Sequence, residues 1–258
     1  MSMPDSEMDS LSGCVAIIPA AGIGKRFSKD KPKQYSIIPS FNDEGNSKEQ
    51  SGDRRNEKCV LDYTLNLFLE SEKIDKVVLV VSSDDRYYST LENIGHSKLI
   101  IIDGGTERVN SVHNALKFIH DKGINANTPI LVHDAVRPCL SKNDLHMLIE
   151  KYFELDSPCF LSAKISDSIK RIDDSGKVTE NVERDDLVRA LTPQIAKFSD
   201  LNKAISTVIK NDVLVNDEIG ALINCDFSAV AIASNGSNIK ITYIEDLELA
   251  SEILSRMN

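Results

Sequence analysis

The stretch CVAIIPAAGIGKRF, residues 14–27, passes from a continuous apolar run at residues 14–19 (CVAIIP) directly into a turn of small residues and cations. Further apolar runs occur at residues 76–82 (KVVLVVS), 98–103 (KLIIID), 129–133 (PILVH), 159–165 (CFLSAKI), 229–233 (AVAIA) and 238–242 (NIKIT). The early runs are rich in β-branched residues and lack strict alternation, which is typical of strands buried on both faces of a parallel sheet. The sequence therefore predicts a strand at each of these places.

Segments with helical periodicity separate the apolar runs. Helices are predicted at residues 60–70, 107–121 and 141–154, and a last helix is predicted to open at Thr242. The last two of these open with Ser141-x-x-Asp144 and Thr242-x-x-Glu245, which have the spacing of a capping box. Alternating strands and helices predict an α/β fold with a Rossmann-like, doubly wound, mostly parallel sheet. Ligands bind beyond the carboxyl ends of such strands, so the loops after the strands should carry the chemistry.

Three segments fall outside this alternation. Residues 1–13 are polar and acidic, and we expect a disordered tail before a single domain over residues 14–258. Residues 40–58 have almost no apolar side chains, which predicts a flexible insertion, either a lid or, in better accord with its composition, an inert extension. Around residues 165–184, two short runs flank Asp173-Asp174-Ser175-Gly176, a favourable turn for a protruding β-hairpin arm.

The overall charge and the cysteines narrow the class of protein. The 258 residues carry a net charge of -10, which argues against a general affinity for nucleic acid or for acidic membranes. No run is long and apolar enough to cross a bilayer, and we expect no secretory signal at the N-terminus. The five cysteines are scattered without a CxxC pair, so neither a disulfide framework nor a zinc cluster is expected. These features are typical of a cytoplasmic protein in a reducing compartment.

The turn after the first apolar run has the properties of an anion site. Small residues from Pro19 to Gly24 let the backbone approach a ligand closely, and exposed N–H groups can bind phosphate oxygens. The turn is not a dinucleotide fingerprint, because Phe27 stands where a third glycine is needed. It is not a Walker A loop either, because Arg26 follows the lysine. Taken alone, the turn fits solvated cations on a glycine-bearing loop about as well as it fits a phosphate site.

A second motif follows this loop, and others occur further along the chain. Pro32-Lys33-Gln34-Tyr35 completes the pattern P-A-A-G-x-G-x-R followed by P-K-Q-Y. Later stretches read DGGTERVNS (103–111), HDAVRP (133–138), ALTPQ (190–194), NDE (216–218) and NIKIT (238–242). From Val15 onward the chain resembles the IspD family, 2-C-methyl-D-erythritol 4-phosphate cytidylyltransferase, in which these motifs occur in the same order.

The resemblance implies an activity and a fold. The reaction would be CTP plus 2-C-methyl-D-erythritol 4-phosphate to CDP-methylerythritol plus pyrophosphate, in the non-mevalonate pathway to isoprenoid precursors. The fold would be that of nucleotidyltransferases, similar to glycosyltransferase type A. Mg²⁺ is expected with the CTP phosphates and not in a dedicated protein site, and the hairpin arm is expected to join two copies in a homodimer.

The resemblance also implies roles for individual residues. It assigns the catalytic cations to Arg26, Lys33, Arg184 and Lys240. It assigns CTP binding to Pro19, Ala20, Ala21, Gly22, Gly24, Lys25, Asp103, Gly104, Ser111 and Ala135. It assigns the acceptor phosphate and polyol to Asp134, Arg137, Ser168, Thr192 and Asn216. The family usually has threonine at the places of Ser168 and Asn216, so the hydroxyl survives only at the first.

Several alternatives stay open. A ribitol 5-phosphate cytidylyltransferase shares the fold, although such enzymes tend to have glycine in place of Ala21. A nicotinamide-dependent dehydrogenase would need the missing third glycine. A non-catalytic nucleotide-binding module would leave the cations Arg26, Lys33 and Lys240 without a purpose. For Asp134 and Arg137, a purely structural salt bridge is the alternative to acceptor binding.

Overall fold

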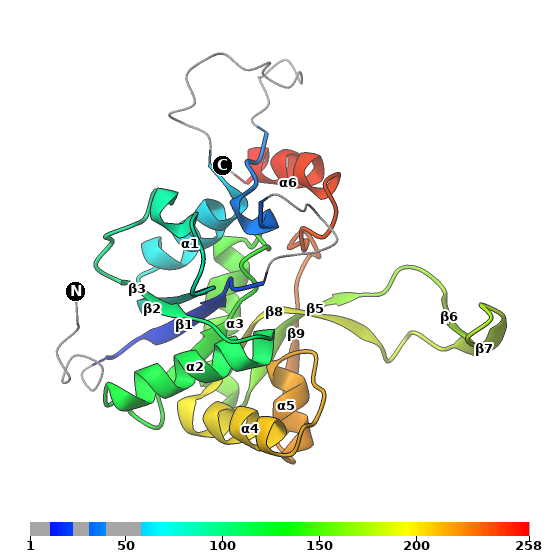
Figure 1. Cartoon of the computed structure of the whole chain (residues 1–258). Helices are drawn as coiled ribbons and strands as arrows, with labels where there is room; N and C mark the ends of the chain where they lie inside the picture. The colour runs from blue at the N-terminus through cyan, green and yellow to red at the C-terminus, as the bar shows by residue number, and fades with distance from the viewer. Residues whose placement is uncertain (1–10, 23–30, 40–57, 258) are drawn as a thin grey trace.

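A computed structural model describes residues 11–22, 31–39 and 58–257, which form an α/β fold around one seven-stranded sheet (Figure 1). The strand order is β3-β2-β1-β4-β8-β5-β9. The strands are β1 Cys14–Pro19, β2 Ile74–Val81, β3 Leu99–Asp103, β4 Pro129–Val132, β5 Cys159–Lys164, β8 Val188–Lys197 and β9 Val230–Ala233. Neighbours among β1 to β4 are parallel, whereas β8 runs antiparallel to both β4 and β5. The predicted mostly parallel sheet is confirmed.

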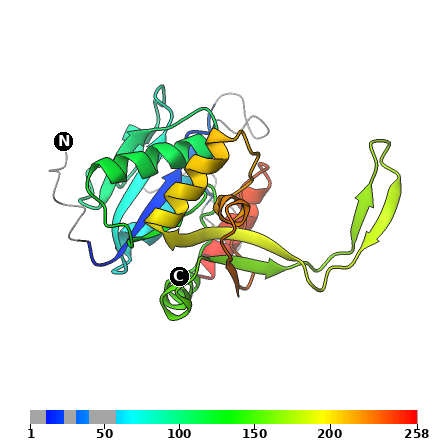
Figure 2. The same cartoon turned by 90° about the horizontal axis from the view of Figure 1, so that it is seen from below.

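Helices cover both faces of this sheet, as a doubly wound fold requires (Figures 1 and 2). The helices are α1 Val60–Glu70, α2 Arg108–Asp121, α3 Lys142–Leu155, α4 Phe198–Lys210, α5 Glu218–Asn224 and α6 Asp246–Ser255, with short 3-10 turns η1 Lys33–Tyr35 and η3 Tyr88–Thr90. Alternate residues of β1 face opposite cores: Ile18 packs with α1 and α3, and Ile17 packs with α2, α4 and α5. Both faces of β1 are therefore buried, which explains its continuous apolar composition.

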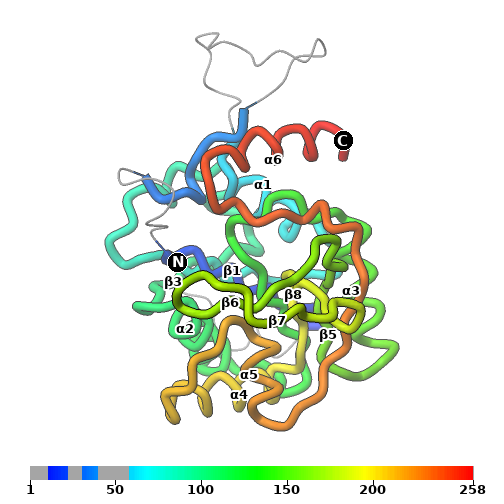
Figure 3. The backbone as a smooth tube through the Cα atoms, turned by 90° about the vertical axis from the view of Figure 1, so that its right-hand side faces the viewer, coloured from blue at the N-terminus to red at the C-terminus, as the bar shows by residue number. Residues whose placement is uncertain are grey.

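A hairpin arm projects from the body of the molecule (Figures 1 and 2). Its strands are β6 Ile169–Ile172 and β7 Val178–Val182, which pair antiparallel in a separate two-stranded sheet. The turn closes where it was predicted: Gly176 has a φ of 82° and its N–H donates to the Asp173 carbonyl at 2.9 Å. Figure 3 looks along the arm, which stands in front of the central sheet in that view.

Two sequence predictions at the C-terminus are wrong. Residues 238–242 form no strand, because their backbone bonds to the loop after β4, with the Ile241 N–H donating to the Val136 carbonyl at 2.9 Å. The last helix begins at Asp246 and not at Thr242. The Asp246 carboxylate accepts the backbone N–H groups of Thr242 and Tyr243 at 2.7 and 2.8 Å, which holds these residues outside the helix. By contrast, Ser141 caps α3 as predicted, accepting the Asp144 N–H at 3.0 Å.

Three elements between the arm and the C-terminus were not predicted, namely β8, α4 and α5. The centre of β8 contains Thr192 and Gln194, which are buried although they are polar. They interrupt the run of apolar residues from which a buried strand is predicted. Of the predicted tail, residues 11–13 are described, and the N–H groups of Ser12 and Gly13 donate to Asp75. The predicted insertion lies outside the described residues except for Lys58, which pairs with Glu92 at 3.0 Å.

Candidate active site

A cleft of about 270 Å³ opens at the carboxyl ends of β1, β3 and β4. The chain order reverses between β1 and β4, and ligands bind at such switch points in open α/β sheets. The lining residues come from the loops that follow these strands, together with η1 and the segment before α6: Pro19, Ala20, Ala21, Gly22, Lys33, Gln34, Gly105, Thr106, Glu107, Arg108, Ser111, Asp134, Ala135, Val136 and Lys240. The loops predicted to carry the chemistry therefore do meet at one place.

The loop after β1 forms one wall of the cleft. The Ala20 N–H donates to the Val80 carbonyl at 2.7 Å, which continues the β1–β2 pairing to the edge of the cleft. The Gln34 amide donates to the carbonyls of Ala20 and Gly22 at 2.6 and 3.2 Å. The predicted site residues Gly24, Lys25 and Arg26 lie outside the described residues.

The loop between β3 and α2 forms the facing wall. A Cβ on Gly104 would lie 2.6 Å from the Ala21 Cβ and 3.0 Å from the Ser111 Oγ, so a glycine is needed for the two loops to pack together. Ser111 is buried, and its hydroxyl accepts the Gly105 N–H and donates to the Glu107 carbonyl, each at 3.2 Å. Gly105 and Thr106 line the cleft, whereas Asp103 is exposed at the strand end and is not part of the lining. Ser111 thus braces the loop from within.

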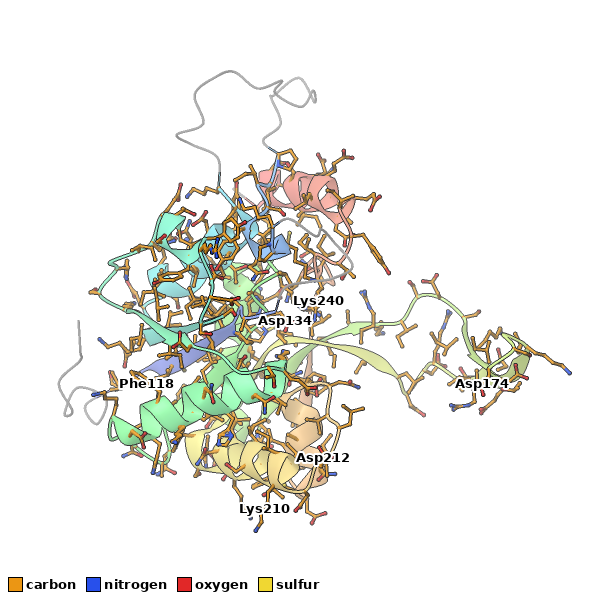
Figure 4. All side chains as sticks on the ribbon, in the orientation of Figure 1. Phe118, Asp134, Asp174, Lys210, Asp212 and Lys240 are labelled. Carbon is orange, nitrogen blue, oxygen red and sulfur yellow. The ribbon has the colours of Figure 1, made fainter. Side chains whose placement is uncertain are left out.

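Asp134 is the electrostatic centre of the site. Its side chain is 9% exposed and contacts three cations: Arg108 Nε and Arg137 Nε at 3.1 Å, and Lys240 Nζ at 3.0 Å. Burial raises the pKa of this carboxyl, but Arg108, Lys240 and Arg137 lower it by more, so its pKa lies well below the ordinary 3.8. Figure 4 shows Asp134 and Lys240 next to each other at the end of the sheet. The structural salt bridge between Asp134 and Arg137 exists, and Asp134 also lines the cleft.

Arg108 links Asp134 to a second carboxylate. Its two terminal nitrogens bind the two oxygens of Glu218 at 2.6 and 2.9 Å, a bidentate arrangement. Burial lowers the pKa of the guanidinium, but Glu218 and Asp134 raise it by more, and the net effect keeps Arg108 charged. Arg108 therefore connects α2, the loop after β4 and the first turn of α5. Asn216 is exposed and lies beside this bridge, lining a smaller hollow with Arg108.

The buried side chain of His133 fixes the backbone around Asp134 through hydrogen bonds. His133 Nε2 contacts the Arg137 carbonyl at 3.2 Å, and since a carbonyl only accepts, this nitrogen carries the proton. The other ring nitrogen then accepts from the Thr192 hydroxyl at 3.0 Å, and that oxygen accepts the Asp134 N–H at 3.1 Å. Burial lowers the pKa of His133 to about 4 against the opposing effect of Asp134, so the ring is neutral near pH 7. Thr192 is buried, and its hydroxyl is used in this chain of bonds.

Two lysines of the cleft come from segments far apart in the chain. Lys33 Nζ donates to the Ile241 carbonyl at 2.7 Å, next to the residue that bears the Lys240 side chain. Ile241 is fully buried in a small core under α6, which fixes this segment. The two predicted phosphate cations are thus held within one site.

The arm residues are not brought to this cleft within one chain. Ser168 is exposed. Arg184 is half-buried, and its guanidinium donates a hydrogen bond to the Ser166 carbonyl. Figure 4 shows the arm leading away from Asp134 and Lys240 to its tip at Asp174. Among the described residues, no group of three His, Cys, Asp or Glu side chains could hold a metal ion, and no helix is long and apolar enough to span a membrane.

Three important site residues had no predicted role: Gln34, Arg108 and Glu218. Each lies inside a motif that was recognised, PKQY, DGGTERVNS or NDE. The available signal was that a charged or amide side chain in a loop motif needs a partner when it is buried. Their partners lie 12 to 110 residues away, so the sequence did not indicate which they are.

Comparison with known proteins identifies the family. The model of the family IspD: 2-C-methyl-D-erythritol 4-phosphate cytidylyltransferase matches residues 48–256. The chain belongs to the IspD family. A member named 2-C-methyl-D-erythritol 4-phosphate cytidylyltransferase from Vibrio vulnificus strain CMCP6 is 35% identical over 247 residues, covering 96% of this chain and 97% of that protein. One of the same name from Photobacterium profundum is 33% identical over 246 residues, covering 94% and 96%.

The fold agrees with solved structures of the IspD family. The crystal structure of the Francisella tularensis IspD protein is 30% identical, with a TM-score of 0.75 and coverage of 94% of this chain and 100% of that one. A structure titled 4-diphosphocytidyl-2C-methyl-D-erythritol synthase is 27% identical with the same TM-score. The resemblance seen in the sequence motifs is confirmed, and with it the assignment to the cytidylyltransferases, a class of nucleotidyltransferase enzymes.

Proposed function

We propose that this chain transfers the cytidylyl group of CTP to 2-C-methyl-D-erythritol 4-phosphate and releases pyrophosphate. The observation that carries the proposal is the cation-lined cleft at the carboxyl ends of β1, β3 and β4, in a chain that belongs to the IspD family. The ribitol 5-phosphate alternative is not favoured, because the similar curated proteins are named for methylerythritol phosphate.

The chemistry needs charge stabilisation more than proton transfer. An oxygen of the acceptor phosphate is already anionic at neutral pH, so it can attack the α-phosphorus of CTP in line and expel pyrophosphate without a strong base. The barrier is the repulsion between two anions and the charge that develops on phosphorus. Positioned cations and N–H donors lower such a barrier by electrostatic stabilisation.

The geometry supports a division of roles among the cations. Lys33 is next to the loop of residues 20–22, so we assign it, with Arg26, to the triphosphate and the transition state. Lys240 contacts Asp134, so we assign it to the acceptor phosphate. Asp134 holds Lys240 in place and, as a carboxylate, can also accept a hydrogen bond from an acceptor hydroxyl.

Magnesium would enter with the nucleotide. Both oxygens of Asp134 are already bonded to Arg108, Arg137 or Lys240, which makes this carboxylate a poor metal ligand. Mg²⁺ characteristically binds through substrate phosphates and keeps several waters. The described residues therefore fit an ion carried by the triphosphate, and its chemistry there is to neutralise phosphate charge.

The arm supports a homodimer in which each copy completes the site of the other. Ile172 and Val178 on the arm are 59% and 57% exposed, which is apolar surface that a second copy could cover. Arg184 and Ser168 lie at the base of the arm strands and do not line the cleft of their own chain, and we assign them to the acceptor phosphate of the partner. The buried free cysteines Cys14, Cys59, Cys139 and Cys159 agree with a reducing compartment, and we place the enzyme in the cytoplasm.

A pyrophosphate-release assay tests the reaction. The chain is supplied with CTP, Mg²⁺ and either methylerythritol 4-phosphate or ribitol 5-phosphate. Release that depends on methylerythritol 4-phosphate is expected, and release with ribitol 5-phosphate alone would refute the acceptor assignment. Mixing the Lys33→Ala and Arg184→Ala variants tests the dimer: shared sites should restore activity, up to about a quarter of the wild-type level in a random mixture of twofold dimers.

A further inference from the structure

We propose that Gln34 is a positioning residue that shapes the nucleotide-binding loop after β1. Gln34 lies in η1, between the proposed triphosphate cation Lys33 and the buried Tyr35, and is only 3% exposed. Its side-chain amide donates to the carbonyls of Ala20 and Gly22 at 2.6 and 3.2 Å. The inference rests on the proposed function, since it assumes that this loop receives the CTP phosphates.

The contacts settle which way the amide points. A backbone carbonyl can only accept, so both bonds come from the nitrogen, and both of its N–H groups are used. The carbonyls of Ala20 and Gly22 are therefore committed to Gln34. A carbonyl oxygen turned toward a phosphate would repel it, whereas a backbone N–H attracts it.

The remaining donors of the loop are left for a ligand. The Ala20 N–H is used by the Val80 carbonyl, but the N–H groups of Ala21 and Gly22 donate to no other residue in the described part of the chain. Ala20, Ala21 and Gly22 all line the cleft. By holding two carbonyls, Gln34 selects the loop conformation in which N–H groups are available to an anion.

Gln34 also has a firm support of its own. The Tyr35 hydroxyl donates to the Asp85 carboxylate at 2.7 Å, and Lys33 Nζ donates to the Ile241 carbonyl at 2.7 Å. The turn η1 is thus tied to the loop after β2 on one side and to the segment of Lys240 on the other. Gln34 connects this fixed turn to the loop, so it sets the position of the loop relative to Lys33.

Two substitutions distinguish the hydrogen bonds that Gln34 donates to the loop from the space that its side chain fills. Gln34→Met keeps a similar volume and removes both hydrogen bonds. Gln34→Glu keeps the shape, but its carboxylate cannot donate and would face two carbonyl oxygens. When protonated, the introduced carboxyl regains one O–H donor, and burial raises the pKa of such a group toward the working range.

The readout is the Kd of the Mg²⁺ complex of CTP, measured by calorimetry at pH 8 and pH 6, with the KM of each substrate measured alongside. Losing the two bonds should raise the CTP Kd roughly 10- to 100-fold in both variants at pH 8. At pH 6 the Gln34→Glu variant should recover a large part of the loss, and Gln34→Met should recover none. The KM for the acceptor should stay within about twofold, because both side-chain hydrogen bonds of Gln34 go to the loop of residues 20–22 and not to Asp134 or Lys240.

Asn93→Asp is a matched control, since it makes the same amide-to-acid change where Asn93 donates to Asn66, outside the cleft. It should leave the CTP Kd and its pH dependence unchanged. Circular dichroism checks that each variant is folded. The proposal is overturned if both Gln34 variants are folded and bind CTP within twofold of the parent, or if both KM values rise equally. Failure of the wild-type chain itself to bind CTP would instead overturn the proposed function.

Discussion

Replacing Glu218 by glutamine tests whether the bridge through Arg108 contributes to stability as its burial implies. Glu218 has a side chain only 3% exposed and binds Arg108 through both carboxylate oxygens, at 2.6 and 2.9 Å. Glutamine has nearly the same shape and keeps one acceptor. It places an N–H₂ group against the other guanidinium nitrogen, so one charge-assisted bond is lost.

The expected cost follows from these contacts. A hydrogen bond to a charged group contributes about 1.5–3 kcal/mol. Breaking a wholly buried ion pair costs about 3–5 kcal/mol, but the Arg108 side chain is 29% exposed and keeps its bond to Asp134, so the full cost does not apply. Glu218 also lies in the first turn of α5, where a negative charge contributes roughly 0.3–1 kcal/mol. The free energy of unfolding should therefore fall by about 2–3 kcal/mol.

Urea unfolding followed by circular dichroism at pH 7 measures this loss, at one fixed protein concentration because association shifts apparent stability. Glu252→Gln is the matched control: its carboxylate pairs with Arg256 on the surface of α6, with side chains 49% and 77% exposed. An exposed pair of this kind contributes less than about 0.5 kcal/mol. If Glu218→Gln cost no more than the control, the reasoning that burial makes this bridge important would be refuted.

Three further predictions concern the cleft, the arm and the buried histidine. Lys33→Ala should lower kcat roughly 10²- to 10³-fold, as expected for loss of one transition-state donor; near-normal pyrophosphate release by the folded variant would contradict its role. Arg184→Ala should raise the KM for the acceptor roughly 10- to 100-fold, by loss of a charge-assisted contact. Kinetics with each substrate varied would disprove this if only the KM for CTP moved. Because burial lowers the pKa of His133 from 6.5 to about 4, the unfolded chain binds a proton in this range that the folded chain excludes. The free energy of unfolding should therefore fall by about 2 kcal/mol between pH 7 and pH 5 on account of this residue. Urea unfolding at both pH values should show a smaller fall in the His133→Gln variant than in the wild-type chain. An equal fall in the two proteins would exclude the effect.

Local interactions explain which elements could be predicted. The strand β1 was predicted with its observed bounds, because both of its faces are buried and its composition is apolar throughout. The cap at Ser141 and the turn before Gly176 were also correct, and each depends on bonds between residues no more than three positions apart. In these cases the residues that decide the structure are close neighbours in the sequence.

The errors arise where distant partners replace the local pattern. β8 buries Gln194, whose amide donates to Asp217 and whose oxygen accepts the Ile219 N–H, so a polar residue occupies the core of a central strand. Residues 238–242 have the composition of a strand, but Arg137 binds the Asn238 carbonyl and draws the segment to the cleft. A sequence window contains neither partner, so periodicity alone gave the wrong result.

The motif from Pro19 to Tyr35 and those after it were sufficient, from the sequence by itself, to indicate the family, the chemistry and the side of the sheet where the cleft lies. Which of their residues interact was decided only by the tertiary structure. Asp134 meets Arg108 from α2 and Lys240 from the segment before α6, and Gln34 reaches back to the carbonyls of Ala20 and Gly22. A buried charge or amide must find a partner when water is removed. Folding can bring that partner from any part of the chain. A sequence motif therefore indicates which residue belongs to the site, but only the tertiary structure shows which residue it contacts.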